Sequence, residues 1–281
     1  RSTLDGHSFP TRRSSDLQAN GASERVFAVL DQPVEKERAD AVTMPPAQGN
    51  VEFRNVSFTY PKSQRPTLRN VSLSIKAGLN VAIVGPNGAG KTTLVSLIPR
   101  LFDADSGDIF IDGWNIRDVT LASLRDQIGM VTQDILTFND TIAANIAYGR
   151  PGATRDEVIA AAKRAFAHEF IMQTPSGYDT IIGEHSAGLS GGQLQRIIIA
   201  RAILKNPAIL IFDEATSQVD AGGETKIHEA VEEIMRGRTT FMIAHRFSTV
   251  VAADVIVVMH DGQIIAQGRH DELIRTCPVY Q

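Results

Sequence analysis

A glycine-rich stretch in the first half of the chain combines residue types and a spacing that bind phosphate groups. Residues 85–93 read Gly-Pro-Asn-Gly-Ala-Gly-Lys-Thr-Thr and fit the pattern G-x-x-x-x-G-K-[ST] directly after the apolar run 81–84. The glycines let the backbone curl with its N–H groups facing a ligand at the positive end of the following helix. Lys91 adds a cation for the outer phosphates of a nucleoside triphosphate, and the Thr92 hydroxyl can ligate magnesium. The residues predicted to contact the nucleotide are Gly85, Pro86, Asn87, Gly88, Ala89, Gly90, Lys91, Thr92 and Thr93.

The same stretch has a simpler interpretation. Asn87 and Gly88 alone would fit the two-residue turn of a β-hairpin. The attached lysine and threonines, and the helical spacing of Leu94, Leu97 and Ile98, favour a loop that runs into a helix instead.

Two adjacent carboxylates follow a buried-strand pattern later in the chain. Residues 209–212 are apolar, and Asp213 and Glu214 come directly after them. Ligands of open α/β sheets bind at the carboxyl ends of the strands, where such side chains are delivered. Asp213 suits magnesium coordination, and Glu214 suits polarising a water molecule that attacks a phosphate. The alternative is an ordinary acidic loop after a strand.

The pentapeptide Leu-Ser-Gly-Gly-Gln at 189–193 opens an amphipathic helix, with Ser190 and Gln193 as a capping box. Gly191 and Gly192 are poor helix formers and cost about 1 kcal/mol each relative to alanine. A second helix end that faces phosphate would explain why bare backbone is kept there. A purely structural cap is the alternative.

Together these segments resemble the ATP-binding cassette (ABC) proteins, whose signature is the pentapeptide found here at 189–193. The resemblance extends over residues 50–275. The resemblance implies an α/β fold: a P-loop NTPase core with a parallel sheet, a small antiparallel β-subdomain and an α-helical subdomain that carries the signature. It also implies ATP and Mg²⁺ as ligands. Each ATP would lie in a dimer between Lys91 of one copy and Ser190, Gly191, Gly192 and Gln193 of the other.

Further residues take roles from this resemblance. Tyr60 looks like the aromatic residue that stacks on adenine, although a lone Tyr near a turn is also an ordinary packing residue. Gln133 resembles the glutamine that contacts magnesium and water, and His245 resembles the histidine that holds the γ-phosphate and Glu214. Asp220 matches the family's loop after the glutamate. The implied catalytic residues are Lys91, Gln133, Glu214 and His245, and the implied magnesium ligands are Thr92, Gln133 and Asp213.

Within the family the resemblance is to exporters with a fused N-terminal membrane domain, such as lipid flippases and multidrug exporters. The matching segments are 71–75, 123–125, 138–146 and 183–184. Two segments depart from the family's motifs. His185 and Ser186 replace the Arg-Gly of the exporters' Gly-Glu-Arg-Gly, and Gln218 and Val219 replace the Ala-Leu of the family's Ser-Ala-Leu-Asp. The implied partners are a membrane domain that is missing from this chain and a second nucleotide-binding domain. The intact Glu214 and signature favour a homodimer, with a heterodimer as the alternative. The implied location is the cytoplasmic face of the inner membrane.

Composition excludes several other classes. The 281 residues are 43% hydrophobic, enough for one substantial core or two small ones. The net charge of −4 argues against nucleic acid as a partner, because binding to its phosphates needs a basic excess. The single Cys277 excludes an internal disulfide, and no run reaches the roughly 18 apolar residues of a membrane-spanning helix.

Hydrophobic periodicity predicts the elements that position these residues. Alternating patterns indicate the strands of the β-subdomain at 51–58, 73–75 and 107–113. Apolar runs indicate buried parallel strands at 208–212, 240–244 and 255–259, followed by a hairpin turn at 261–262. Residues 122–205 are mostly helical in pattern, and Thr154 with Glu157 forms a capping box. The helix that it opens is expected to carry one apolar face of Val158, Ile159, Ala162, Ala165, Phe166 and Phe170.

We expect three segments. Residues 1–17 resemble a translated sequencing adapter and are interpreted as adapter-derived or as a disordered tail, with a targeting peptide as the alternative. Residues 18–49 are interpreted as the end of a membrane-domain helix and a linker. Residues 50–281 form the nucleotide-binding domain, with the helical subdomain at about 134–205.

Other functions remain open at this point. The separate ATPase subunit of an ABC importer would normally lack the helix at 24–31, and a soluble ABC ATPase would need a coiled-coil insertion or a second cassette. A regulatory module without turnover would be expected to lack Glu214 or His245. The transported substrate is not encoded in this segment.

Overall fold

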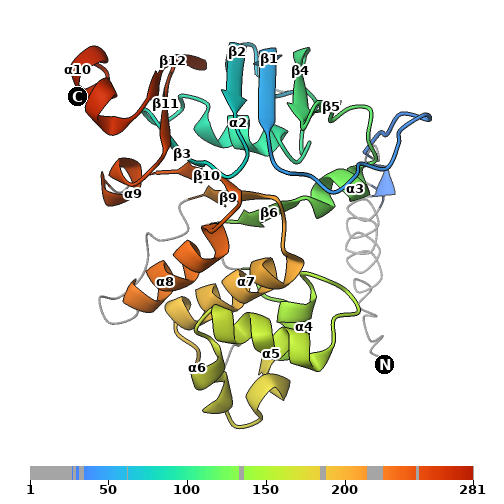
Figure 1. Ribbon diagram of the computed structural model, residues 1–281. Helices are drawn as coiled ribbons and strands as arrows, with labels where there is room; N and C mark the ends of the chain where they lie inside the picture. The colour runs from blue at the N-terminus through green and yellow to red at the C-terminus, as the bar shows by residue number, and fades with distance from the viewer. Residues whose placement is uncertain are drawn as a thin grey trace, which may run out of the picture. The chain divides into compact units, whose positions relative to one another are not determined.

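The computed structural model of the chain describes residues 27, 30–31, 35–61, 63–132, 136–183, 188–213, 224–244 and 247–280 (Figure 1). It contains two compact units, Arg1–Glu37 and Arg38–Gln281. All the strands and helices α2 to α10 belong to the second unit. The predicted segment 1–17 lies outside the described residues. The predicted boundary at 49/50 stays a prediction.

A six-stranded sheet forms the centre of the second unit, in the order β12-β11-β3-β10-β9-β6. All neighbouring strands are parallel except β12, which pairs antiparallel with β11. The predicted buried strands and terminal hairpin are therefore confirmed. The strands are β3 (Asn80–Val84), β6 (Ile128–Val131), β9 (Ile209–Asp213), β10 (Thr239–Ile243), β11 (Val255–His260) and β12 (Gln263–Gly268).

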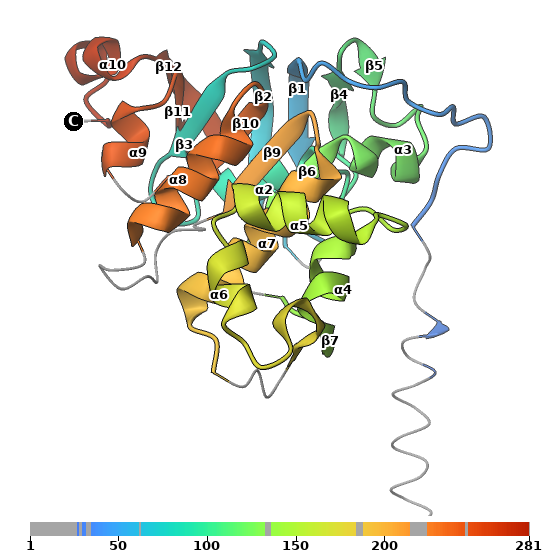
Figure 2. The same cartoon turned by 60° about the horizontal axis from the view of Figure 1, so that its bottom comes forward.

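The central sheet is apolar on both faces because each face packs against a different core. Along β9, Ile209 and Ile211 lie in one hydrophobic cluster, whereas Leu210 and Phe212 lie in another. Successive side chains of a strand point to opposite faces, so a strand covered on both sides must be apolar throughout. Figures 1 and 2 show helices α4 to α8 on one side of this sheet and strands β1, β2 and β4 on the other.

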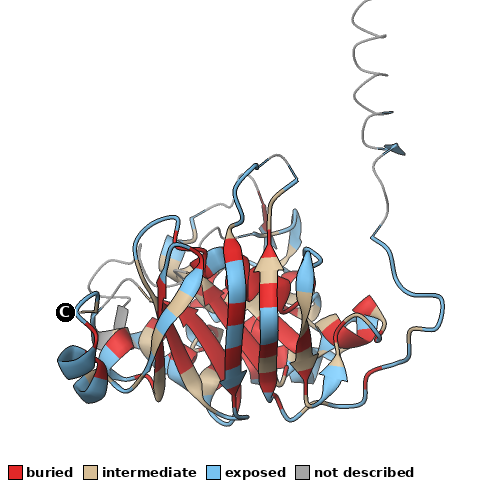
Figure 3. Ribbon diagram, turned by 90° about the horizontal axis from the view of Figure 1, so that it is seen from above, coloured by how far each residue is buried: buried red, intermediate tan, exposed pale blue. Residues whose placement is uncertain are grey.

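The predicted β-subdomain is a four-stranded antiparallel sheet in the order β2-β1-β4-β5. Its strands are β1 (Val51–Phe58), β2 (Leu68–Ile75), β4 (Ser106–Ile111) and β5 (Trp114–Asn115). Buried and exposed positions alternate along β1 and β2, as Figure 3 shows. The buried face shares its core with helix α2 (Lys91–Leu97) and the central sheet, so both sheets hold this helix in place.

The helical subdomain packs around the second core. Its helices are α4 (Ile142–Ala147), α5 (Arg155–Arg164), α6 (His168–Met172) and α7 (Gly191–Lys205). Two short strands, β7 (Asp140–Thr141) and β8 (Ile181–Ile182), pair within it. The remaining elements are α3 (Leu121–Asp126), the 3₁₀ turn η1 (Gly177–Asp179), α8 (Glu224–Met235), α9 (Phe247–Val251) and α10 (His270–Thr276).

The prediction of a single helix from Thr154 through Phe170 is wrong about the length of the helix. The capping box is present, but α5 ends at Arg164, and Phe166 adopts a left-handed backbone conformation with φ of 53°. Phe170 belongs to the separate helix α6. Arg196 of α7 donates a 2.7 Å hydrogen bond to the carbonyl of Phe166, which holds the chain in this turn. A contact with a distant residue therefore decides a break that the local pattern does not show.

Residues just before β1 are attached to the turn between β4 and β5. The Asp112 carboxylate accepts hydrogen bonds from the backbone N–H groups of Gln48, Gly49 and Asn50, at 2.6, 3.0 and 2.9 Å. Burial raises the pKa of Asp112, but these hydrogen bonds outweigh it and leave the pKa below its usual value.

Replacing Asp112 by Ala is expected to lower the free energy of unfolding by about 1–3 kcal/mol, the cost of leaving these amides without a partner. Because the folded-state pKa is lowered, the contribution is full above the unfolded-state pKa of about 3.9 and is lost as pH falls through the folded-state value. Urea unfolding should therefore separate the two proteins more at pH ~7 than at pH ~3. Asp118→Ala is the control, because its exposed ion pair with Arg38 contributes less than about 1 kcal/mol. Equal differences at both pH values would contradict this assignment.

No described helix is both long enough and apolar enough to cross a membrane.

Candidate nucleotide-binding site

The glycine-rich loop connects a strand to a helix, as predicted. Strand β3 ends at Val84 and helix α2 begins at Lys91, so residues 85–90 form the connection. The hairpin alternative for Asn87 and Gly88 is wrong, because the strands beside β3 run parallel to it.

Three glycines of the loop have positive φ, at 148° for Gly85, 80° for Gly88 and 97° for Gly90. A Cβ on Gly85 would lie 2.1 Å from the carbonyl oxygen of Met259, and one on Gly90 would lie 2.8 Å from Leu68 Cδ2. These two positions need glycine because the loop is pressed against β11 and β2. A Cβ on Gly88 would meet no atom within 4 Å, so this part of the loop faces open space.

Lys91 lies under the loop and not in solvent. Its side chain is 7% exposed, and its Nζ donates hydrogen bonds to the carbonyls of Gly85 at 2.8 Å and Pro86 at 3.0 Å. These bonds place a positive charge beside the first turn of α2, whose free N–H groups already favour an anion. The arrangement has the charge and the donors that phosphate requires.

A cavity of about 320 Å³ opens beside this loop, a size typical of small-ligand sites. Tyr60, the residue expected at adenine, lines it together with the loop. Its lining residues are Tyr60, Thr67, Asn87, Gly88, Gly90, Lys91, Thr92, Thr93 and Ile243. The predicted base-binding and phosphate-binding residues therefore share one cavity. Thr67 and Ile243 were missed by the sequence reasoning, because nothing local marks them as ligand contacts.

The carboxyl ends of the central strands meet beside the loop. Asp213 is in register with Ile243 of β10, which is in register with Ile83 of β3. Val131 at the end of β6 pairs with Phe212. The half-buried Asp213 carboxylate therefore lies at the end of β9. One strand, β10, separates β9 from β3, which leads into the loop.

Two of the three predicted magnesium ligands, Thr92 and Asp213, are among the described residues, and both fit the chemistry of that ion. The exposed Thr92 hydroxyl and the Asp213 carboxylate are hard oxygen donors, the kind that Mg²⁺ prefers. Gln133, Glu214, Asp220 and His245 lie outside the described residues. The strands that precede Gln133, Glu214 and His245 all end at this same edge of the sheet. Their roles remain predictions.

The signature segment forms the predicted cap of α7. The Ser190 hydroxyl accepts a 3.3 Å hydrogen bond from the Gln193 N–H, and Gln193 Oε1 accepts a 2.8 Å bond from the Ser190 N–H. A Cβ on Gly191 would meet no atom within 4 Å, so the first residue of the helix faces open space. None of Ser190, Gly191, Gly192 and Gln193 lines the cavity at the phosphate loop. Within one chain, the structure does not bring the two predicted phosphate-binding segments together.

The sequence profile of the family described as "ABC transporter" matches residues 68–217, which include the phosphate loop, the signature and the Asp213-Glu214 pair. The chain belongs to the ABC transporter family. Relatives of this ABC transporter chain include an ATP-dependent lipid A-core flippase of Syntrophus aciditrophicus and a putative multidrug export ATP-binding/permease protein of Bacillus subtilis. Both are 52% identical over 258 residues and 92% of this chain, which covers 43% and 44% of their lengths respectively.

A solved structure of a bacterial Atm1-family ABC exporter with ATP bound is 44% identical, with a TM-score of 0.83. The match covers 94% of this chain and 46% of that one. The predicted resemblance to the exporter branch of ABC transporters is confirmed by these names. The chain spans less than half the length of these relatives.

Proposed function

We propose that this chain binds MgATP, hydrolyses it, and powers the export of a substrate across a membrane by closing a dimer. The observation that carries the proposal is the register of β3, β10 and β9, which places the phosphate loop and Asp213 at one edge of the sheet beside the cavity. The identity of about half to solved and curated ABC exporters supports the export role.

The roles of the residues follow from their chemistry. Lys91 and the loop N–H groups bind the outer phosphates, and Tyr60 stacks on adenine. Thr92, Asp213 and Gln133 would hold Mg²⁺, which when bound neutralises charge on the phosphates. Glu214 accepts a proton from the attacking water, and His245 orients Glu214 and the terminal phosphate.

The partners are proposals as well. A membrane domain preceding this segment would receive the motion, with this chain at the cytoplasmic face of the inner membrane. A second copy would supply Ser190, Gly191, Gly192 and Gln193 to the phosphates, with Asp220 at the contact between copies. The open space at Gly191, and the absence of the signature residues from the cavity lining within one chain, support this arrangement. Nucleic acid is not expected as a partner.

The purified chain is expected to release phosphate from ATP in the presence of Mg²⁺. Lys91→Ala should lower this rate by about 100-fold or more, as removal of a charge-stabilising donor typically does. Chelation of Mg²⁺ should stop the release. Lys163→Ala is the matched control, because Lys163 is exposed on α5, far along the chain from the loop. Phosphate release that continues both in Lys91→Ala and after chelation of Mg²⁺ would contradict the proposal.

A further inference from the structure

Tyr60 stands in a cluster of three aromatic rings, Phe58, Tyr60 and Phe102. The centroid of the Tyr60 ring lies 4.9 Å from that of Phe58 and 5.2 Å from that of Phe102, with interplanar angles of 80° and 83°. Phe58 and Phe102 also contact each other, at 5.5 Å. Two rings that stand nearly perpendicular to Tyr60 limit the tilt of its plane.

The far end of the same ring is tied to the phosphate loop. The hydroxyl groups of Tyr60 and Thr93 form a 3.0 Å hydrogen bond. Thr93 is 4% exposed and lies two residues after Lys91, in the first turn of α2. The ring is therefore fixed both in tilt and in its distance from the residues that would hold the phosphates.

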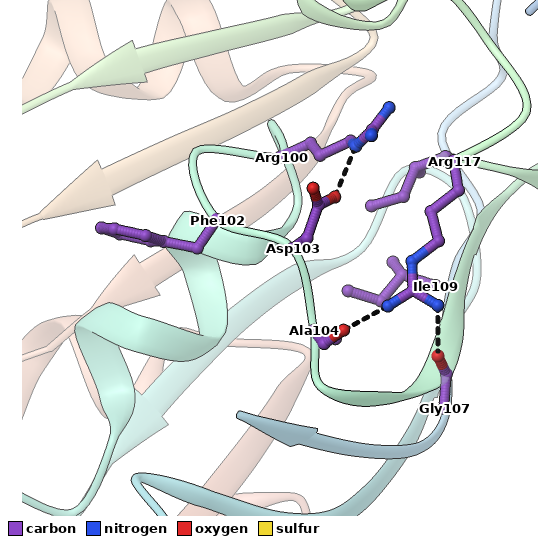
Figure 4. Close-up of a pocket in the computed structure, with 8 residues that line it drawn as sticks. Arg100, Phe102, Asp103, Ala104, Gly107, Ile109 and Arg117 are labelled. Atoms are coloured by element: carbon purple, nitrogen blue, oxygen red, sulfur yellow. Dashed lines mark hydrogen bonds and ion pairs between the residues drawn. The ribbon is translucent and has the colours of Figure 1, made fainter. Parts of the chain in front are cut away.

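Phe102 lies in the loop of residues 98–105 between α2 and β4, and several side chains hold this loop by hydrogen bonds. Arg100 Nε donates a 2.7 Å hydrogen bond to Asp103 within the loop. Arg117 donates to the backbone carbonyl of Ala104 in the loop and to that of Gly107 at the start of β4. Arg125 of α3 donates to two more. Figure 4 shows Phe102 extending from this loop away from Arg117. The carbonyl acceptors are those of Pro99, Arg100, Ala104 and Gly107.

We propose that Phe102 is a positioning residue of the nucleotide site, which with the Tyr60–Thr93 hydrogen bond orients the Tyr60 ring for the base. The inference rests on the proposed function, in which Tyr60 stacks on adenine. Phe102 does not line the cavity, so it acts through Tyr60 and not through the ligand. A ring held in its bound orientation loses less side-chain freedom when ATP binds, which raises affinity.

The test compares ligands with and without a base. Phe102→Leu keeps an apolar side chain but removes the ring. It should weaken the affinity of the chain for MgATP by roughly twofold to tenfold, the size of an aromatic pair contribution, and leave that for magnesium tripolyphosphate unchanged. Phe102→Tyr keeps the ring and should retain the affinity of the original protein for ATP. Leu101→Ala, at an exposed neighbour on the same loop, is the control. Isothermal titration calorimetry measures each binding constant.

A double-mutant cycle with Tyr60 shows whether Phe102 acts through it. Tyr60→Ala should weaken ATP binding by roughly fivefold to a hundredfold. Tyr60→Trp keeps a ring for the base but lacks the hydroxyl that bonds to Thr93, so its loss should be smaller than that of Tyr60→Ala. Adding Phe102→Leu to Tyr60→Ala should cause no further loss, because the ring to be oriented is gone.

The outcomes separate the two proposals. A loss with Tyr60→Ala but none with Phe102→Leu overturns the positioning role and leaves base stacking intact. Full additivity in the double variant, or an equal loss for tripolyphosphate, also overturns it. Unchanged ATP affinity in Tyr60→Ala removes the stacking role from the proposed function, and the positioning role falls with it.

Discussion

Glu214→Gln is expected to lower steady-state ATP hydrolysis by about 100-fold or more while ATP binding is kept, because a general base contributes that much and an amide cannot accept the proton. Glutamine keeps the shape of the side chain, so residues that bind the phosphates are not disturbed. The variant should accumulate as an ATP-bound dimer, since hydrolysis is the step that would open it.

Phosphate release under saturating MgATP measures the first effect, and size-exclusion chromatography with ATP measures the second. Glu232→Gln makes the same chemical change at an exposed position of α8 and should leave turnover unchanged. If Glu214→Gln hydrolysed ATP at the rate of the unsubstituted protein, Glu214 would have no catalytic role. Asp213 would still lie at the end of β9, at the same edge of the sheet as the loop.

Mixed dimers of two inactive variants are expected to recover ATP trapping. One variant carries Lys91→Ala, which removes the cation of the phosphate loop. The other carries Gly191→Asp, which places a carboxylate where the terminal phosphate of an ATP on the opposite chain would lie, and like charges repel. Both carry Glu214→Gln to prevent turnover. Each homodimer should fail to trap ATP.

In the structure, Gly191→Asp adds a negative charge at the start of α7 without a steric clash. The new side chain enters space with no atom within 4 Å, and the position is the first residue of α7, where an acidic residue favours the helix. Gly191→Asn has nearly the same shape without the charge and is the matched control. It should trap much more ATP than Gly191→Asp.

In a mixed dimer, one site contains both Lys91→Ala and Gly191→Asp. The other site combines the unsubstituted phosphate loop of one chain with the unsubstituted signature of the other. Filter binding of labelled ATP to purified mixed dimers should therefore find at most one trapped ATP per dimer. If verified mixed dimers trap none, either each site is built within one chain or both sites must fill together. The role of Ser190, Gly191 and Gly192 across the dimer would then lose its support.

The local elements of the site followed from the sequence because short-range interactions determine them. The two capping boxes, Thr154 with Glu157 and Ser190 with Gln193, each need only residues three positions apart, and both form as predicted. The strand, loop and helix around residues 85–91 follow from glycines, an apolar run and helical spacing. The buried strands of the central sheet follow from their continuous apolar character.

Other features needed the tertiary structure because they depend on residues far apart in the chain. The end of α5 depends on Arg196, which is 30 positions from Phe166. Met44, before the predicted start of the domain, is buried in its core, where Ser123 accepts its N–H. No local pattern contains these contacts.

By itself, the sequence determined that this chain carries a phosphate loop, an acidic strand end and a capped signature helix, because each is a local pattern of backbone geometry and charge. Only the tertiary structure decided that Tyr60, Thr93 and Phe102 meet beside that loop, and that the signature helix lies outside its cavity lining. The physical reason is that strand order and side-chain packing bring together residues that share no local signal. The order β3-β10-β9 in particular is set by the pairing of strands far apart in the chain, and it brings Asp213 to the sheet edge at which the phosphate loop begins.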